Sequence, residues 1–228
     1  MKTLFIRSIT GIIYLSILGC AFFISEWTLV VVFTLFLCIA LFEYIHLLQK
    51  LPASQNKMQQ LFRRWILPVV WIIFPVLLLE YWCIEWGATN IVVALIIILS
   101  LNDTLAYLFG SLLGKHKIWT RVSPKKSWEG FVGGLVTTMA VIGFIVHIPY
   151  FQNDIFTNQY LWMGFAFVVI IAGTFGDFTE SFLKRLAQQK DSGKILPGHG
   201  GILDRMDSLL FAVPAGFVYW EICEYIVS

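Results

Sequence analysis

A dense group of charged residues lies between Asp177 and Asp207 in an otherwise apolar chain. This stretch of 31 positions holds five of the 14 acidic residues and five of the 16 basic ones. Charge is costly in apolar surroundings, and a charged group of this density therefore indicates a functional site. The residue types favour metal-assisted phosphoryl-type transfer. Carboxylates can hold a divalent cation, basic groups can neutralise phosphate, and glycines let the backbone approach it.

Three carboxylates of this stretch are candidate metal ligands. Asp204 and Asp207 are three residues apart, so on a helical turn they share a face, and Asp177 on the preceding helix can meet them across a loop. Oxygen ligands beside a phosphate favour Mg²⁺, which takes one or two carboxylates and keeps positions for phosphate and water. The alternative is that Asp204 and Asp207 only pair with Arg205 and Lys184.

Hydroxyl and basic groups follow Asp177 on the same predicted helix. Asp177, Ser181 and Lys184 are spaced i, i+4 and i+7, which places them on one stripe, with Arg185 beside it. Arginine binds phosphate as a planar fork and lysine as a point charge. The alternative is that these basic side chains only reach lipid headgroups.

The segment Pro197-Gly198-His199-Gly200-Gly201 is rich in glycine. Such a segment lets backbone N–H groups approach a phosphate without intervening side chains, and His199 can donate to a phosphate oxygen. A plain turn with an incidental histidine is the alternative.

A second basic segment, Ser123-Pro124-Lys125-Lys126, precedes another apolar run. Adjacent lysines beside a membrane bind anionic lipid with about 1 kcal/mol each, and they can equally draw in a nucleotide or lipid phosphate. Composition does not separate these two roles. The nearby Gly110–Lys115 segment is not a Walker A loop, because it is one residue too short between its glycines and lacks the required Ser or Thr.

The composition predicts an integral membrane protein. The chain is 58% hydrophobic and 13% charged, whereas soluble domains average roughly 25% charged. We expect an all-α, polytopic membrane helix bundle in one domain, 1–228, with generic helices in 1–100 and catalytic helices and loops in 101–228. A span needs ~20 apolar residues, and seven runs qualify: Ser8 to Ile24, Thr28 to Leu48, Trp65 to Tyr81, Ala88 to Phe109, Phe131 to Tyr150, Leu161 to Gly176 and Leu209 to Ile226. The sixth helix is expected to continue through Gln189, and Pro68 and Pro75 to kink the third.

The distribution of basic residues predicts the orientation. With the N-terminus in the cytoplasm, all 16 Lys and Arg fall on the cytoplasmic side, as the positive-inside rule requires. The two richest loops, 110–130 and 184–208, then share that side. The four cysteines lie in apolar runs without metal-ligand spacing, which is typical of packing residues.

Together these residues resemble the signature of the phosphatidate cytidylyltransferase (CDP-diacylglycerol synthase) family. The signature residues are Ser181, Lys184, Arg185, Lys190, Asp191, Gly193, Leu196, Pro197, His199, Gly200, Gly201, Ile202, Asp204, Arg205, Met206 and Asp207. The segments 103–110 and 123–130 are also similar to the family, so the resemblance covers the chain from about residue 100 onward. The family usually has Ser-Gln where this chain has Gly173-Thr174, so an amide contact is lost.

The resemblance implies a reaction and a set of site residues. CTP and phosphatidate would give CDP-diacylglycerol and pyrophosphate at the cytoplasmic face of a bacterial inner membrane. Mg²⁺ would be held by Asp177, Asp204 and Asp207. Lys184 and Arg185 would complete the catalytic group, and the substrate-binding residues would be Asp103, Ser123, Lys125, Lys126, Ser181, Lys190, Asp191, His199, Gly200, Gly201 and Arg205. A monovalent cation and a homodimer are left open, and no nucleic-acid partner is expected.

Two other classes of function remain as alternatives. Another CTP-dependent lipid transferase or kinase would use similar groups, although the Asp-Gly-x-x-Ala-Arg motif of CDP-alcohol phosphotransferases does not occur in this sequence. A cation transporter would use Asp103, Asp177 and Asp204 as intramembrane ligands. Transport would place these carboxylates near the middle of the bilayer, whereas the sequence places them at helix ends beside basic residues.

Overall fold

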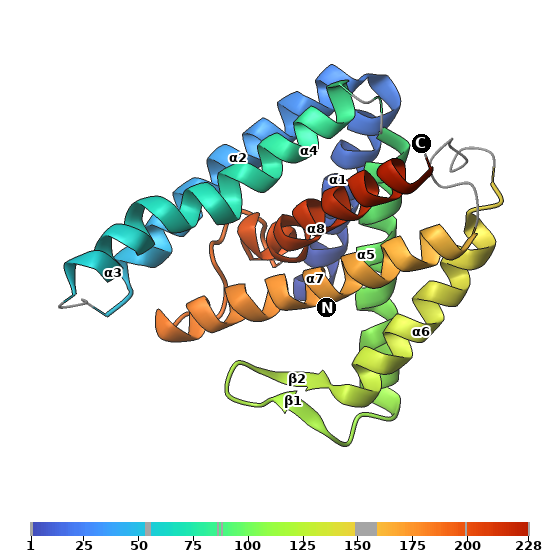
Figure 1. Ribbon diagram of the computed structural model, residues 1–228. Helices are drawn as coiled ribbons and strands as arrows, with labels where there is room; N and C mark the ends of the chain where they lie inside the picture. The colour runs from blue at the N-terminus through green and yellow to red at the C-terminus, as the bar shows by residue number, and fades with distance from the viewer. Residues whose placement is uncertain are drawn as a thin grey trace. The chain divides into compact units, whose positions relative to one another are not determined.

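The computed structural model describes residues 2–52, 56–85, 87, 89–148, 159–198 and 200–227. Within them the chain forms helices and one short β hairpin (Figure 1). The helices are α1 (Lys2–Ile24), α2 (Glu26–Gln49), α3 (Lys57–Leu61), η1 (Phe62–Ile66), η2 (Val69–Ile73), α4 (Phe74–Glu85), α5 (Thr89–Leu112), α6 (Trp128–Ile145), α7 (Gln159–Leu186) and α8 (Leu203–Val227), and the strands are β1 (Lys117–Trp119) and β2 (Ser123–Ser127).

The expectation of a helical integral membrane protein is confirmed in its coarse form. Among the described residues, six helical segments are long and apolar enough to cross a membrane: Glu26–Gln49, Lys57–Glu85, Thr89–Leu112, Trp128–Ile145, Gln159–Leu186 and Leu203–Ile226. The first predicted span, Ser8 to Ile24, lies within α1. Apolar runs of this length therefore locate the helices, because only a helix satisfies its own backbone groups in lipid.

Three sequence expectations are corrected. The fold is not strictly all-α, because the loop 110–130 contains the antiparallel hairpin β1–β2. Helix α7 ends at Leu186 and not at Gln189, because Gln188 adopts a left-handed φ of 54° and the Gln189 N–H donates to the Lys184 carbonyl at 2.8 Å. This is the Schellman pattern of a helix C-terminus. The last helix begins at Leu203, before the predicted Leu209.

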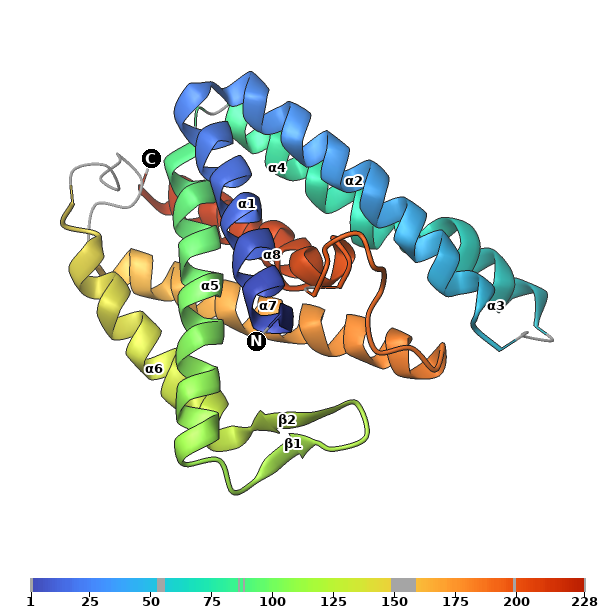
Figure 2. The same cartoon turned by 180° about the vertical axis from the view of Figure 1, so that it is seen from behind.

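The chain folds into two compact parts. The first part comprises Met1–Thr89 and Thr179–Leu210. Ser25 separates α1 from α2 and caps α2 by accepting a hydrogen bond from the Thr28 N–H at 3.2 Å. Helix α2 packs along η2 and α4, which lie beside it in both views (Figures 1 and 2). The core between them contains Phe33, Trp82 and other buried apolar side chains.

The segment before α4 contains π-helical turns beside its prolines. Pro68 lies between η1 and η2, and Pro75 follows η2. Proline lacks the N–H that an α-helix uses, and a wider π turn is one way to accommodate that loss. The Tyr44 hydroxyl of α2 donates to the Arg63 carbonyl of η1 at 2.7 Å, so α2 satisfies one of the backbone groups in this turn.

The second part comprises Asn90–Phe178 and Phe211–Ser228. Helices α5 and α6 cross on small residues: a Cβ added at Gly130 would lie 2.6 Å from the Ala106 carbonyl oxygen, and one at Gly134 would lie 2.9 Å from the Ala106 Cβ. Such a small-residue contact lets two membrane helices approach closely. Both helices meet the β1–β2 hairpin at this end (Figure 2). The crossing therefore fixes the base of the hairpin.

Candidate functional site

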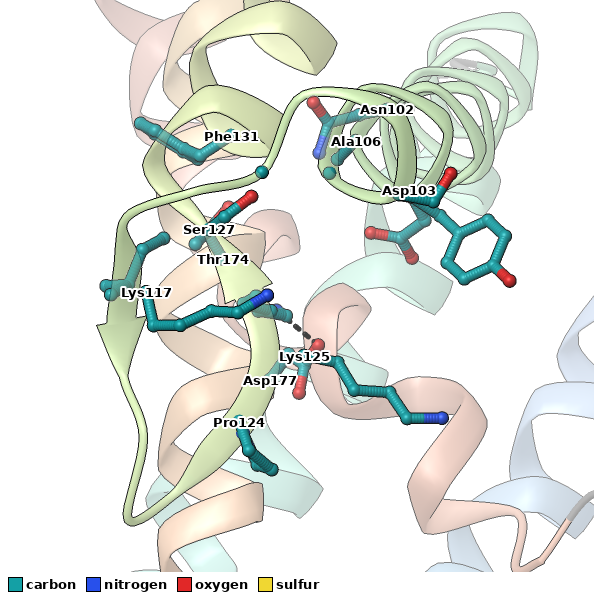
Figure 3. Close-up of a pocket in the computed structure, with 16 residues that line it drawn as sticks. Asn102, Asp103, Ala106, Lys117, Pro124, Lys125, Ser127, Phe131, Thr174 and Asp177 are labelled. Atoms are coloured by element: carbon teal, nitrogen blue, oxygen red, sulfur yellow. Dashed lines mark ion pairs between the residues drawn. The ribbon is translucent and has the colours of Figure 1, made fainter.

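A cavity lined by both apolar and charged residues lies in the second part, between α5, the hairpin and α7 (Figure 3). It encloses ≈ 600 Å³, a volume typical of small-molecule sites. Asn102 and Asp103 come from α5, and Lys117 and Lys125 from the hairpin strands. Lys126 and Asp177 complete its charged lining, so three ammonium groups face two carboxylates. This excess of positive charge suits an anionic ligand.

The hairpin is held at its base by polar contacts. The carboxylate of Glu129, in the first turn of α6, accepts hydrogen bonds from the His116 N–H at 3.1 Å and pairs with His116 Nδ1 at 2.6 Å. Ser127 ends β2 and caps α6 by accepting from the Gly130 N–H at 3.2 Å. These contacts place Lys125 and Lys126, the last residues of β2 before Ser127, at the cavity wall.

Lys126 binds Asp177 directly. Its ammonium forms an ion pair with Asp177 Oδ2 and lies over the Phe178 ring at 4.7 Å from the ring centre. Both charged side chains are about a quarter exposed, at 29% and 25%. The structure therefore brings together the predicted metal ligand Asp177 and the predicted phosphate-binding residue Lys126. The positive charge next to the Asp177 carboxylate is the Lys126 ammonium.

The first part holds a second charged cluster, centred on Lys184 of α7. Its ammonium lies 2.5 Å from Glu180 Oε2 and 2.6 Å from Asp204 Oδ1. The side chains of Lys184, Glu180 and Asp204 are 10%, 0% and 8% exposed, so the cluster is buried. Asp207 lies one turn along α8 from Asp204 and acts electrostatically on Glu180. The acids near Lys184 outnumber its single positive charge.

Asp204 also binds the loop that precedes α8. Its Oδ2 accepts from the Gly201 N–H at 2.8 Å and from the Ser192 N–H at 2.9 Å, and its Oδ1 accepts from the Ser192 N–H at 3.1 Å. Helix α8 begins at Leu203, so Asp204 and Asp207 lie one turn apart on the same helix, the condition under which their spacing puts them on one face. The ion pair of Asp204 with Lys184, given above as the alternative, is present. Asp204 therefore joins α7, the loop and α8.

The glycine-rich segment forms a closed turn. Leu196 and Gly200 exchange two backbone hydrogen bonds, of 2.9 and 3.1 Å, and Gly198 and Gly200 have φ values of 80° and 89°. Such left-handed backbone favours glycine. The Thr10 hydroxyl of α1 donates to the Pro197 carbonyl at 3.1 Å. His199 lies outside the described residues. The use of this segment as a phosphate cradle stays a prediction.

The remaining predicted residues lie on α7, in the loop after it, on α8 and on β2. Ser181 is buried on α7, one turn before Arg185, which donates to the Gln189 carbonyl at 3.1 Å. Ser208 donates its N–H to Asp207 at 2.7 Å. Lys190, Asp191 and Arg205 are exposed, and Ser123 is half-buried at the start of β2. Their contacts with substrate stay predictions.

Sequence reasoning missed two buried acids, Glu43 and Glu180. Glu180 precedes Lys184 by one helical turn, and this i,i+4 spacing of opposite charges was a signal that could have identified it. Glu43 lies in the second apolar run and is 2% exposed. An acid within a membrane helix is itself a signal of function, although the sequence does not reveal its distant partners.

The oxygen donors near Lys184 are carboxylates, a kind of ligand that Mg²⁺ takes. Within the described residues, three or more Asp, Glu, His or Cys side chains do not come together as a metal-binding group. None of the described residues donates a hydrogen bond to the buried Glu180 Oε1. Asp204 and Asp207, one turn apart on α8, are two carboxylates of the kind that Mg²⁺ takes while it keeps water, so they fit such an ion.

Comparison with known proteins identifies the family. The chain is 45% identical over 118 residues to "Phosphatidate cytidylyltransferase" of Staphylococcus aureus (strain COL), and the match covers 52% of this chain and 44% of that protein. It is 47% identical over 114 residues to the protein of the same name from Staphylococcus haemolyticus (strain JCSC1435), covering 50% and 42%. The chain thus matches less than half the length of these relatives. The sequence model described as "Cytidylyltransferase family" matches residues 50–223, which include both charged clusters, and the chain therefore belongs to the cytidylyltransferase family.

Proposed function

We propose that this protein transfers CMP from CTP to phosphatidate, giving CDP-diacylglycerol and pyrophosphate. The observation that carries the proposal is the ≈ 600 Å³ cavity lined by Lys117, Lys125 and Lys126 in a chain whose helices are otherwise apolar. Family membership and the names of the relatives support the same reaction. One substrate is soluble and the other is a lipid, so their phosphates meet where charged groups border apolar helices.

The proposed chemistry is a displacement at phosphorus. An oxygen of the phosphatidate phosphate attacks the α-phosphorus of CTP and forms a new P–O bond. The bond from that phosphorus to the oxygen bridging the α- and β-phosphates breaks, and pyrophosphate leaves with the electron pair. Phosphatidate is already ionised at neutral pH, so no strong general base is required. Positioning and charge neutralisation then dominate the rate.

The protein's cations have distinct parts in this proposal. Lys125 and Lys126 of β2 bind phosphate oxygens in the cavity. Lys184 and Arg185 of α7 neutralise the charge that develops as pyrophosphate leaves. Phe178, against which Lys126 packs, limits the directions in which that ammonium can move.

Mg²⁺ is proposed as the cofactor. Asp204 and Asp207 would hold it in the first part, and the sequence motif adds Asp177 as a third proposed ligand. When bound, such an ion polarises phosphate oxygens and neutralises their charge.

The proposal includes the finer features of the membrane arrangement. It comprises seven spans, with α1 as the first, an N-terminus in the cytoplasm and a site on the cytoplasmic face of a bacterial inner membrane. The sequence basis is the placement of all 16 Lys and Arg on one side. Homodimer formation stays a prediction.

Incorporation of radiolabelled CTP tests the proposal. Membranes that contain the protein are supplied with phosphatidate, CTP labelled in the α-phosphate or in the γ-phosphate, and Mg²⁺. We expect the α-label in lipid and the γ-label in pyrophosphate. Lipid that carries the γ-label would instead identify a kinase, and absence of both labels from lipid would refute a transferase. Membranes without the protein provide the background.

A further inference from the structure

Glu43 is a buried acid of α2 that lies before the residues matched by the family model. It is 2% exposed within a helix that is long and apolar enough to cross a membrane. A charge in such a place requires polar partners. These partners come from the distant loop that leads into α8.

The carboxylate of Glu43 accepts three hydrogen bonds from this loop and the start of α8. The Ile202 N–H donates to Oε1 at 3.2 Å, and the Leu203 N–H donates to Oε2 at 2.9 Å. The Ser192 hydroxyl donates to Oε2 at 3.2 Å. The first N–H groups of a helix lack partners within the helix, and a negative charge there is stabilised by the helix dipole. Glu43 therefore caps α8 from another helix.

Two glycines allow the loop to fold closely around Glu43. A Cβ added at Gly193 or at Gly201 would overlap with the Glu43 carboxylate. Side chains at these positions would therefore push the loop away from α2. The Glu43 carboxylate is thus in close contact with the loop at both Gly193 and Gly201.

The same loop residues also bind Asp204. Ser192 donates its hydroxyl to Glu43 and its backbone N–H to Asp204. Gly201 packs on Glu43, and its N–H donates to Asp204 at 2.8 Å. A displacement of the loop from Glu43 therefore moves both N–H groups that orient Asp204 beside Lys184.

We propose that Glu43 is a positioning residue: it holds Ser192 and the segment Gly201–Leu203 in the arrangement that orients Asp204. The effect on catalysis rests on the proposed cytidylyl transfer, whereas the effect on the loop does not. The competing explanation is that Glu43 contributes only to overall stability, as any satisfied buried acid does.

Glu43→Gln is the test variant. Glutamine keeps the shape but offers one acceptor oxygen, and its NH₂ group faces a backbone N–H donor. One N–H of Ile202 or Leu203 is then left without an acceptor in a buried place. The matched control is Glu80→Gln, since Glu80 is also a buried acid of the first part, 8% exposed, and its partner is the Thr34 hydroxyl at 2.9 Å.

Three measurements are made on each purified full-length variant in lipid nanodiscs: kcat and KM for CTP, the thermal unfolding midpoint, and hydrogen exchange of the backbone amides of residues 191–203. We expect Glu43→Gln to lower kcat about 10- to 100-fold, the range for residues that orient a functional group. We expect faster exchange confined to 191–203, with an unfolding midpoint close to that of Glu80→Gln. The control variant should keep wild-type kcat and wild-type exchange in this loop.

Unchanged exchange in residues 191–203 would overturn the proposal, as would a loss of kcat that Glu80→Gln matches. Faster exchange throughout the first part would show a stabilising role only, and would also overturn it. If Glu43→Gln does not fold, Ser192→Ala removes one of the three hydrogen bonds, and we expect a 2- to 10-fold lower kcat with faster exchange in the same loop. If the wild type transfers no CMP, the proposed function fails, and the exchange comparison still decides whether Glu43 positions the loop.

Discussion

Lys184 is the cation on which two buried carboxylates depend, and Lys184→Met tests this charge balance. Its ammonium lies 2.5 Å from Glu180 and 2.6 Å from Asp204, and the acids are 0% and 8% exposed. Methionine keeps a flexible side chain of similar length and removes the charge. Removal of one partner from a buried ion pair costs about 3–5 kcal/mol, because the remaining charge keeps its desolvation cost.

This cost converts to a measurable change in thermal stability. For a chain of this size, each kcal/mol lowers the unfolding midpoint by about 2–4 °C, so Lys184→Met should lower it by roughly 6–20 °C. The assay is tryptophan fluorescence of the purified protein in detergent during heating. Lys184→Arg is the matched control, because it retains the positive charge and should lose less stability.

A second variant separates charge from packing. In Glu180→Gln/Lys184→Met the neutral amide replaces the more deeply buried acid, so the double variant should regain part of the stability lost in Lys184→Met. The reasoning is refuted if Lys184→Met unfolds at the wild-type temperature, or if adding Glu180→Gln lowers the midpoint further. Either result would mean that the ammonium does not compensate for the two carboxylates.

Three further predictions concern the crossing of α5 and α6, the ion pair of Lys126 and the proposed Mg²⁺. Gly130→Ala should lower the unfolding midpoint by several degrees, since its methyl group would lie 2.6 Å from the Ala106 carbonyl oxygen, whereas Gly143→Ala, with its nearest neighbour at 3.7 Å, should not. Lys126→Met removes the cation paired with Asp177 and should lower CTP incorporation at least about tenfold with little change in the midpoint. Chelation with EDTA should abolish CTP incorporation. Added Mg²⁺ should restore incorporation better than Ca²⁺, because Ca²⁺ prefers more ligands at longer distances. Incorporation that persists in EDTA would remove Mg²⁺ from the proposal.

The sequence was sufficient for features that depend on local pattern. Apolar runs located the helices, because the length of a span and the need to satisfy backbone groups are general constraints. The spacing of Asp204 and Asp207 puts them on one face wherever they lie on a helix, and α8 includes both. Pairing of Asp204 with Lys184, 20 residues away, was the alternative interpretation, and the structure shows this pair.

Features that depend on distant partners were beyond such reasoning. The three-residue strand Lys117–Trp119 is too short to show a period of two, so the hairpin was missed. The end of α7 depends on one left-handed residue, Gln188, whose type does not usually signal a helix end. Glu43 meets its partners about 150–160 positions along the chain, where no spacing rule applies.

The hydrogen bonds of Asp204 link the shape of the loop to the chemistry proposed for this residue. A carboxylate has about four lone-pair sites, and those of Asp204 face the Lys184 ammonium and the N–H groups of Ser192 and Gly201. A cation that binds Asp204 must therefore share an oxygen with these donors or displace one of them. Displacement of Lys184 would leave the buried Glu180 without its cation, whereas displacement of an N–H would loosen the loop that Glu43 is proposed to hold. If Glu43 holds the loop as proposed, both N–H donors of Asp204 stay in place, and a residue outside the signature would then determine which oxygens of Asp204 a cation could share.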